Sequence, residues 1–313
     1  MLLYALRRLA IGAILVLLVT FITYFLLSFS FDNIITSRLG QSASPELVAE
    51  LKADLGLDRS VFVQYLDWLG NVVQGDLGTS FFTGEPVVDA VPARLAVTLS
   101  VIVPALIISV IVAVVLGVTA ASRGGVVDTL TQGLMLAGYL IPGLLVAIGL
   151  VVLFAVNLGW LPAGGYTAPG DDLGAWSRSI VIPVITIAIG GSANIASQVR
   201  GTMVDELRKD YVRTLRTRGV PTRSLVIKHA LRNAAGPALT VFGLEFVAMF
   251  GSALIIEQVF ALPGFGLYSF NAALQGDFPV MMGVTLFAVG LTVTVNLITD
   301  LANGWLNPKA RIY

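Results

Sequence analysis

Six runs of apolar residues, each near or above the length needed to cross a membrane as a helix, divide the chain into spans and loops. They cover residues 9–31, 95–121, 130–158, 180–197, 238–256 and 280–298. A spanning helix needs roughly 20 apolar residues, and backbone groups inside a bilayer must bond within their own segment. A membrane barrel would instead show alternating segments of about ten residues. The pattern therefore predicts an all-α membrane protein with six transmembrane helices.

The composition agrees with lipid as the main solvent. Of 313 residues, 56% are hydrophobic and 12% are charged, and the mean hydropathy is +0.88. A soluble domain has roughly 25% charged residues. The chain has no cysteine and one histidine, His229, which excludes disulfides and thiolate metal sites. No catalytic residue, no metal site and no nucleic-acid partner is therefore predicted.

The positions of Lys and Arg predict the orientation in the membrane. If the N-terminus is inside, the inner side receives 14 of the 19 basic residues, nine of them between residues 200 and 232. Short cytoplasmic loops carry such an excess of positive charge. The run 9–31 is too long for the apolar part of a signal peptide, which has roughly 7–15 residues, so it is the first span. We expect a multi-pass protein of the bacterial plasma (inner) membrane with both termini in the cytoplasm.

The first large loop, residues 32–94, is predicted to lie outside the cell and carries nine acids against four bases. A capping serine followed by proline predicts a helix over residues 44–56, and an aromatic-rich stretch predicts an amphipathic helix at the interface over residues 62–73. The loop either shields the helix ends or contacts a delivery protein. The predicted division is residues 1–31 (cytoplasmic N-terminus and first helix), 32–94 (extracytoplasmic cap) and 95–313 (five-helix core with a cytoplasmic coupling loop, 200–236).

The loop 200–236 has the signals of two short helices around a glycine turn. Acids lie at its start and bases towards its end, which suits the helix dipole. Gly219 stands where a helix C-cap is expected, and Pro221 follows two residues later. Residues 222–233 then begin a second helix. On charge alone, the loop is explained by the positive-inside bias and by contact with anionic lipid.

The sequence of this loop resembles that of the cytoplasmic "EAA" loop of ABC-importer permeases of the dipeptide/oligopeptide type. The resemblance rests on Asp210-Tyr211-Val212-Arg213-Thr214, Gly219 and Lys228-His229-Ala230-Leu231-Arg232-Asn233, together with Gly75-Asp76-Leu77-Gly78-Thr79-Ser80, Leu158-Gly159-Trp160-Leu161-Pro162-Ala163 and Glu257-Gln258-Val259-Phe260-Ala261-Leu262-Pro263-Gly264-Phe265-Gly266. It covers nearly the whole chain. Leu215 and Thr217 depart from it, because the subfamily usually has alanines there.

The resemblance implies a type I importer permease fold and a set of partners. These are a second homologous permease subunit, two ABC ATPase subunits, an extracytoplasmic peptide-binding protein and the lipid bilayer. Transport of di- or oligopeptides into the cytoplasm would proceed by alternating access. The residues expected to couple to the ATPases are Asp210, Arg213, Leu215, Arg218, Gly219, Val220 and Arg223.

The chain itself has no ATP-binding motif. A phosphate-binding loop of the Walker A type needs a lysine directly after a glycine, and none of the four lysines follows one. We therefore expect no enzymatic activity and no cofactor on this chain, with ATP and Mg²⁺ bound by the partner ATPases.

Three polar residues within the spans are candidates for the translocation path. Glu245 lies inside the fifth span, where a carboxylate needs a wet cavity or a partner. It either lines the path or bonds within the helix bundle or to the neighbouring permease. Asn194 and Gln198 share one face of the fourth span and have the same two explanations. The neighbouring Gly190-Gly191-Ser192 favours close helix packing.

Two other functions stay open at this point. A proton-coupled secondary transporter would use Glu245 to carry the proton, although such folds show internal repeats that are not evident here. The same ABC permease role for nickel or another small solute is the second alternative.

Overall fold

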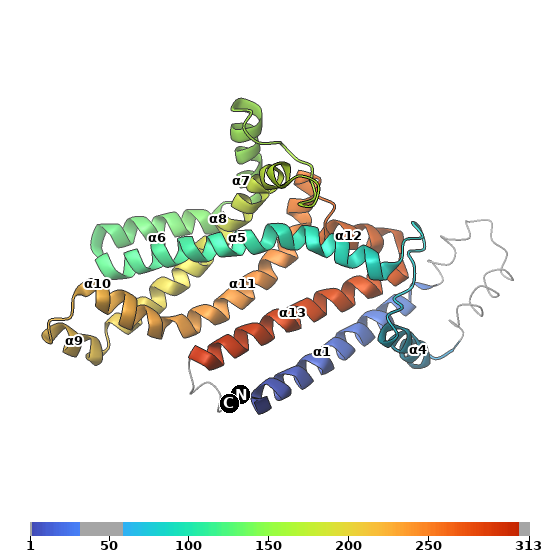
Figure 1. Cartoon of the computed structure of the whole chain (residues 1–313), viewed down its shortest axis with the longest axis horizontal. Coiled ribbons are helices and arrows are strands. Elements are labelled where there is room, and N and C mark those ends of the chain that lie inside the picture. The colour runs from blue at the N-terminus through green and yellow to red at the C-terminus, as the bar shows by residue number, and fades with distance from the viewer. Residues whose placement is uncertain (1, 32–58, 307–313) are drawn as a thin grey trace. The chain divides into compact units, whose positions relative to one another are not determined.

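The computed structural model describes residues 2–31 and 59–306, which form helices joined by turns (Figure 1). The elements are α1 (Leu2–Ser28), α4 (Val61–Val73), α5 (Val87–Arg123), α6 (Gly125–Leu140), α7 (Gly143–Leu150), the π-helix η1 (Val151–Asn157), α8 (Leu173–Leu207), α9 (Asp210–Thr217), α10 (Thr222–Ser224), the π-helix η2 (Leu225–Ala230), α11 (Leu231–Phe260), α12 (Phe265–Gln275) and α13 (Phe278–Leu306). The all-α prediction is confirmed. The helix predicted over residues 44–56 lies outside the described residues.

Within the described residues, five single helices are long and apolar enough to cross a membrane. They are Tyr4–Ser28, Val87–Arg123, Leu173–Leu207, Leu239–Phe260 and Phe278–Trp305. A sixth span results if the bent pair Gly125–Leu140 and Gly143–Asn157 counts as one. The amphipathic helix predicted over residues 62–73 is also present, as α4.

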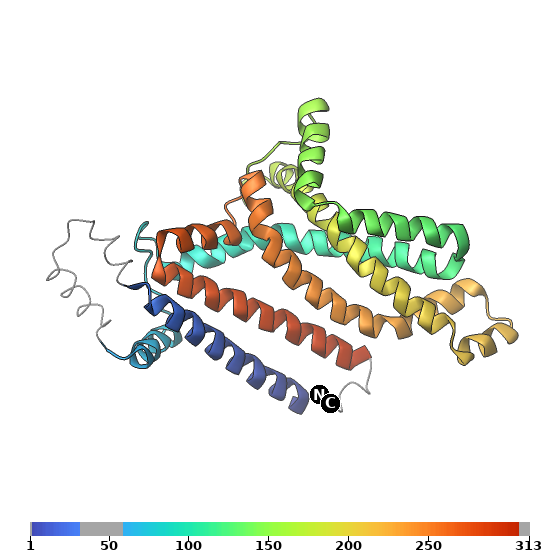
Figure 2. The ribbon, with the colours of Figure 1, turned by 180° about the vertical axis from the view of Figure 1, so that it is seen from behind.

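The third apolar run, in which we expected a spanning helix kinked at Pro142, is interrupted rather than kinked. It is broken between α6 and α7, whose axes differ by 94°, so α7 and η1 lead away from α6 (Figure 2). Ile141 is extended, with ψ of 120°, and Pro142 follows it. A residue before proline avoids the helical region, because the proline ring clashes with its backbone. The apolar pattern continues through the break, which explains why the pattern does not reveal it.

The predicted cytoplasmic loop 200–236 is shorter in the structure than in the sequence pattern. α8 continues to Leu207, and the helical backbone from Thr222 runs through η2 into α11 without interruption. Only residues 208–221 with α9 lie between these two long helices. Hydropathy detects the part of a helix that contacts lipid, whereas the backbone hydrogen bonds continue into the polar ends.

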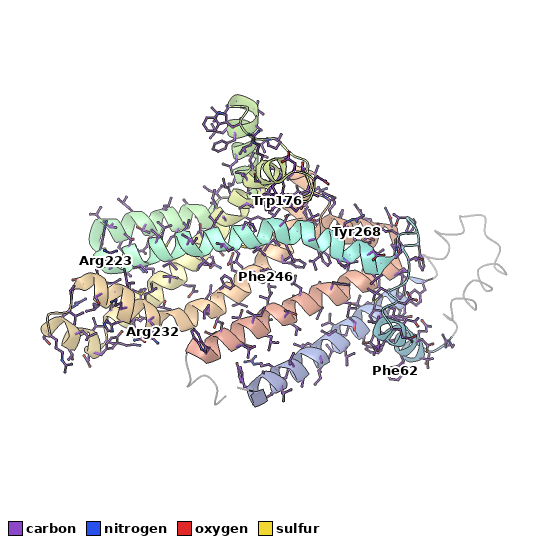
Figure 3. The ribbon with its side chains drawn as sticks, in the orientation of Figure 1. Phe62, Trp176, Arg223, Arg232, Phe246 and Tyr268 are labelled. Atoms are coloured by element: carbon purple, nitrogen blue, oxygen red, sulfur yellow. The ribbon has the colours of Figure 1, made fainter. Side chains whose placement is uncertain are left out.

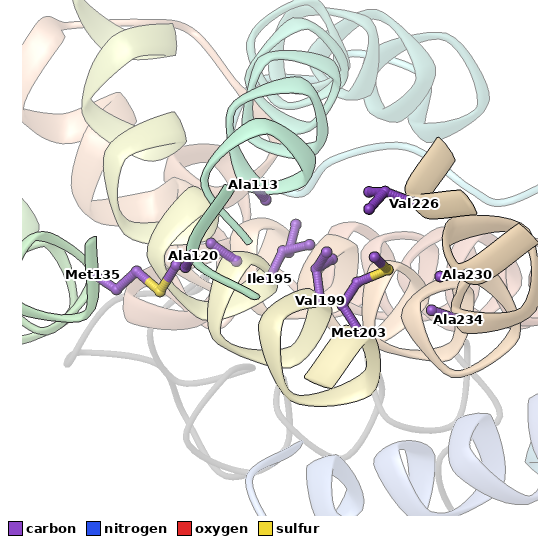
Figure 4. Close-up of a cluster of buried hydrophobic side chains, with 10 residues drawn as sticks. Ala113, Ala120, Met135, Ile195, Val199, Met203, Val226, Ala230 and Ala234 are labelled. Atoms are coloured by element: carbon purple, nitrogen blue, oxygen red, sulfur yellow. The ribbon is translucent and has the colours of Figure 1, made fainter. Parts of the chain in front are cut away.

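The chain divides into two compact units, and one of them holds the candidate site. Its described residues are 98–262 and 295–306. Its core is a cluster of small and medium side chains from α5, α6, α8, η2 and α11, including Met135, Ile195 and Met203 (Figure 4). Gly117 of α5 permits close packing on α8, because a Cβ there would lie 2.9 Å from the carbonyl oxygen of Ala196.

The other unit contains residues 2–97 and 263–294, as far as the structure describes them. Here α1 packs against α4 through aromatic side chains. The Tyr65 hydroxyl lies 2.9 Å from the Thr20 hydroxyl and donates to the carbonyl oxygen of Leu17 over 3.0 Å. The ring of Tyr24 contacts those of Tyr65 and Phe278. These contacts join the end of the first helix to the segment that follows it.

Candidate functional site

The predicted helix, glycine turn and second helix are all present at one end of the unit. α9 ends in a Schellman motif, in which Val220 N–H donates to Leu215 C=O (3.1 Å) and Gly219 N–H donates to Arg216 C=O (3.0 Å). Gly219 has φ of +78°, which is unfavourable for any residue with a Cβ. The chain then turns through Pro221 into α10. We call residues 208–224 the coupling segment.

The residues predicted to couple to an ATPase gather on this segment. Leu215 and Val220 are half-buried, whereas Asp210, Arg213, Arg218, Gly219 and Arg223 are exposed (Arg223 is labelled in Figure 3). The Arg213–Asp210 pair has an N–O distance of 3.7 Å on a fully solvated surface, where it adds little stability. A Cβ on Gly219 would meet no atom within 4 Å. The exposed face therefore has room for another protein.

One apolar side chain anchors α9. Val212 is fully buried, and its helix packs against η2. The exposed polar face and the single buried anchor make α9 a short amphipathic helix that lies on the ends of longer helices (Figures 1 and 2).

Four polar side chains form a joint that holds the N-terminal end of α9. They are Glu206, Lys209, Tyr211 and Asn233. Glu206 lies in the last turn of α8, is buried, and accepts a hydrogen bond from the Tyr211 hydroxyl over 2.8 Å. Lys209 pairs with its second oxygen. Asn233 of α11 donates to the Tyr211 oxygen over 3.3 Å. The joint thus connects α8, α9 and α11.

The electrostatics of the joint follow from these contacts. The hydrogen bond to Glu206 raises the pKa of Lys209, and burial raises the pKa of the Tyr211 hydroxyl. Lys209 is therefore charged and Tyr211 neutral at physiological pH. Sequence reasoning did not identify Glu206, Tyr211 and Asn233 as a functional group. Tyr211 and Asn233 belong to the motifs that carry the resemblance, but no motif shows that they meet Glu206 when the helices pack.

A stripe of exposed polar or small residues follows one face of α8. The α8 stripe consists of Gly190, Asn194, Ser197 and Gln198, and all four are exposed. Gly190, Asn194 and Gln198 are spaced four residues apart and Ser197 follows Asn194 by three, which places them on one side of a helix. The residues between them, such as Ile195, are buried. Such a stripe in a membrane helix is unfavourable against lipid and favourable against water or another protein.

Asn194 and Glu245 join the α8 stripe to α11. The Asn194 amide donates to Oε2 of Glu245 over 2.6 Å, and Glu245 is 8% exposed. Its carboxylate also lines a pocket of about 470 Å³, the Glu245 pocket, at the break between α6 and α7. Both explanations of Glu245 therefore have support, since it bonds within the bundle and faces a cavity. Gly190 and Gly191 both line the pocket, and Gly191 also packs closely, because a Cβ there would overlap Met249.

A second cavity extends from Asn194 towards the N-terminal end of α6. This α6/α8 groove of about 620 Å³ includes Gln132, Asn194, Ser197 and Arg200. Arg200 makes a two-pronged ion pair with Asp128 of α6, with N–O distances of 2.5 and 2.6 Å. Asn194 lines the groove and donates to Glu245, which lines the other pocket, so this hydrogen bond links one residue of each cavity. Among the described residues, no three His, Cys, Asp or Glu side chains are grouped closely enough to hold a metal ion.

Known proteins resemble this chain over its full length. Residues 113–312 match the family described as the binding-protein-dependent transport system inner membrane component, and residues 1–102 match the N-terminal part of such membrane components. A predicted peptide transport system permease protein of Brucella abortus is 36% identical over 307 residues, covering 98% of each chain. A probable peptide ABC transporter permease protein of Sinorhizobium fredii is 34% identical, over 98% of this chain and 99% of its own. An oligopeptide transport system permease protein of Bacillus subtilis is 31% identical, with 98% of each chain covered.

Proposed function

Since this chain belongs to the family of binding-protein-dependent transport system inner membrane components, we propose that it forms half of the pore of an ATP-driven importer of di- or oligopeptides. It is a multi-pass inner-membrane permease subunit. The names of its relatives support peptides over nickel or another small solute as the cargo. Dependence on a binding protein supports an ABC importer over the proton-coupled alternative.

The observation that supports this mechanism is the way in which α9 is attached to the long helices. Its exposed face carries the predicted ATPase-coupling residues, while Val212 and the polar joint fix it to α8 and α11. A force applied to α9 by an ATPase subunit is thereby transmitted to both long helices. Coupling through Asp210, Arg213, Leu215, Arg218, Gly219, Val220 and Arg223 would convert closure of the ATPases into alternating access.

We propose that the chain works with three kinds of partner protein. A second permease completes the pore, two ABC ATPases bind ATP and Mg²⁺ beneath it, and a peptide-binding protein delivers cargo from outside. The basic coupling segment lies inside, which also places both termini in the cytoplasm. In this arrangement residues 1–31 anchor the chain, residues 32–94 form the extracytoplasmic cap, and residues 95–313 form the transporting core.

The translocation path is proposed to follow the α8 stripe. Asn194 and Gln198 are exposed on it, and Glu245 reaches it through Asn194. The mainly apolar Glu245 pocket and the more polar α6/α8 groove both contain residues of the stripe, and together they provide space for a solute.

Gly219→Val tests coupling in the reconstituted complex. The variant is expected to lower solute uptake per ATP hydrolysed at least about tenfold, because a side chain at this turn blocks docking and disfavours the positive φ. Gly124→Val is the matched control, since Gly124 also has positive φ (63°) and open space but lies between α5 and α6. Equal effects of the two variants, or wild-type coupling in Gly219→Val, would contradict docking at α9.

Thiol labelling tests the path, because the chain has no cysteine of its own. Single cysteines at Asn194 and Gln198 are expected to react with a water-soluble, charged methanethiosulfonate, and the reaction rate should change when ATP and vanadate trap the ATPases. Ile195→Cys is the matched control, because Ile195 is buried on the same helix. Unreactive cysteines at both stripe positions would remove the α8 stripe from the path.

A further inference from the structure

The Glu245 pocket combines one acidic group with apolar walls. Leu144, Ile187, Met249 and Ile256 supply most of the lining, and Thr186 adds a hydroxyl. Small-molecule sites of roughly 300–1,000 Å³ usually have such apolar walls and a few placed polar groups. The pocket of about 470 Å³ falls within this range.

The two oxygens of Glu245 have different surroundings. Oε2 accepts the hydrogen bond from Asn194, and in the described part of the chain Oε1 has no hydrogen-bond partner. A Cβ on Gly191 would lie 3.3 Å from Oε1 and 2.2 Å from the end of the Met249 side chain, so glycine at this position leaves room for the Met249 methyl group near the carboxylate. One oxygen is therefore held and the other is available to a ligand. The neighbouring Phe246 marks the level of this group on α11 (Figure 3).

The hydrogen-bond donor to Glu245 is the side-chain amide of Asn194, which is neutral. A buried carboxylate is stable in its charged form when a cation and additional hydrogen bonds compensate for the lost water. A ligand that enters the pocket with a positive group would supply that compensation. An apolar body beside the positive group would fit the walls.

From this geometry we propose that the Glu245 pocket binds a protonated primary amine attached to an apolar group, such as the amino-terminal residue of a peptide. The amine donates to Oε1 of Glu245, while Asn194 holds Oε2 and orients the carboxylate. The inference rests on the proposed path along α8 and adds the chemistry that the path recognises. The pocket would then be a binding site along the path that favours cations over anions.

The experiment measures charge preference directly in the purified, assembled complex without its binding protein. Ala248→Cys places a thiol in the pocket one turn from Glu245, at an exposed position. Two probes of similar size are compared, 2-aminoethyl methanethiosulfonate (a cation) and 2-sulfonatoethyl methanethiosulfonate (an anion). Ser197→Cys in the α6/α8 groove serves as the matched reporter outside the pocket.

With Glu245 present, the cation is expected to react faster at residue 248. Glu245→Gln preserves shape and should reduce the cation-to-anion rate ratio there about tenfold, while leaving the ratio at residue 197 unchanged. Glu245→Asp, which keeps the charge, should retain most of the preference. A dipeptide with a free amino terminus should also slow labelling at residue 248 more than its N-acetylated form.

The outcomes separate this inference from the proposed function. If residues 248 and 197 both react but Glu245→Gln leaves the ratio at 248 unchanged, the amine site is wrong and the path stands. Equal protection by the free and acetylated dipeptides would also overturn the amine site. If neither position reacts with either probe, the path along α8 fails and the amine site fails with it.

Discussion

The helices α1 and α8 are both long enough to cross a membrane, yet their surroundings differ. In the most apolar stretch of α1 the mean hydropathy is 2.6 and 17% of the residues are buried, whereas in α8 the values are 1.8 and 67%. The more hydrophobic helix is therefore the less buried one. In a bilayer, lipid tails are as apolar as a protein core, so hydrophobicity does not measure packing. α8 is packed tightly except along its polar stripe, and this combination suits a helix at the centre of a transporter.

Ile195→Ala compared with Ile14→Ala tests this contrast most directly. Ile195 of α8 is 2% exposed and Ile14 of α1 is 62% exposed. We expect Ile195→Ala to lower the free energy of unfolding by about 2–4 kcal/mol, because it leaves a cavity, and Ile14→Ala to change it by less than about 0.5 kcal/mol. Denaturant unfolding in one detergent measures both. Equal losses would show that α1 is packed as tightly as α8.

Gly117→Ala and Gly12→Ala compare the close contacts of the two helices. A Cβ on Gly117 would lie 2.9 Å from a backbone oxygen of α8, which does not move away easily. A Cβ on Gly12 of α1 would lie 2.4 Å from a methyl group of Val293, which is a side-chain atom rather than part of the backbone. Gly117→Ala should therefore destabilise by about 1–3 kcal/mol and Gly12→Ala by less. The reverse order, measured by thermal unfolding, would contradict the central role of α8.

Arg200→Gln asks whether α8 also depends on its ion pair with α6. The expected result is a fall of a few degrees in the midpoint of thermal unfolding, because Asp128 loses both hydrogen bonds of the pair. Asp128→Asn alone and the double variant complete a mutant cycle. A double variant that loses as much as the sum of the single ones would show that the pair contributes no coupling energy.

Tyr65→Phe probes the specific contact of α1 with α4. The substitution removes the hydroxyl that bonds to Thr20 and to the Leu17 carbonyl. The expected loss is about 0.5–1.5 kcal/mol, the smallest of the four effects. Tyr4→Phe on α1 serves as the control. If Tyr65→Phe destabilised more than Ile195→Ala, then α1 would be held more strongly than its exposure suggests.

The sequence allowed the helical class and the number of spans to be predicted, because apolar runs of spanning length have few other structures open to them. The break at Pro142 and the polar ends of α8 and α11 were not predicted correctly. Both depend on where helical hydrogen bonding stops, which apolar patterning reports poorly. Proline signalled a disturbance, but not a turn of 94°.

The helix α9 was predictable because its signals are local. The dipole pattern, Gly219 and Pro221 all lie within a dozen residues. The polar joint and the Asn194–Glu245 bond were not predictable, since the bonded pairs Tyr211–Asn233 and Asn194–Glu245 are 22 and 51 residues apart in sequence. Such pairs become neighbours only when separate helices pack. The assignment of the coupling and path residues stays a prediction until the experiments above are done.

The linkers of α9 have a mechanical consequence. Two residues, 208 and 209, join it to α8, and four residues, 218–221, join it to α10. At most about 3.5 Å per residue, these links reach roughly 7 and 14 Å. With so little slack, α9 has no freedom to follow a moving ATPase while the membrane helices stay behind. If either linker were lengthened with flexible residues, α9 could move with the ATPase without moving the membrane helices.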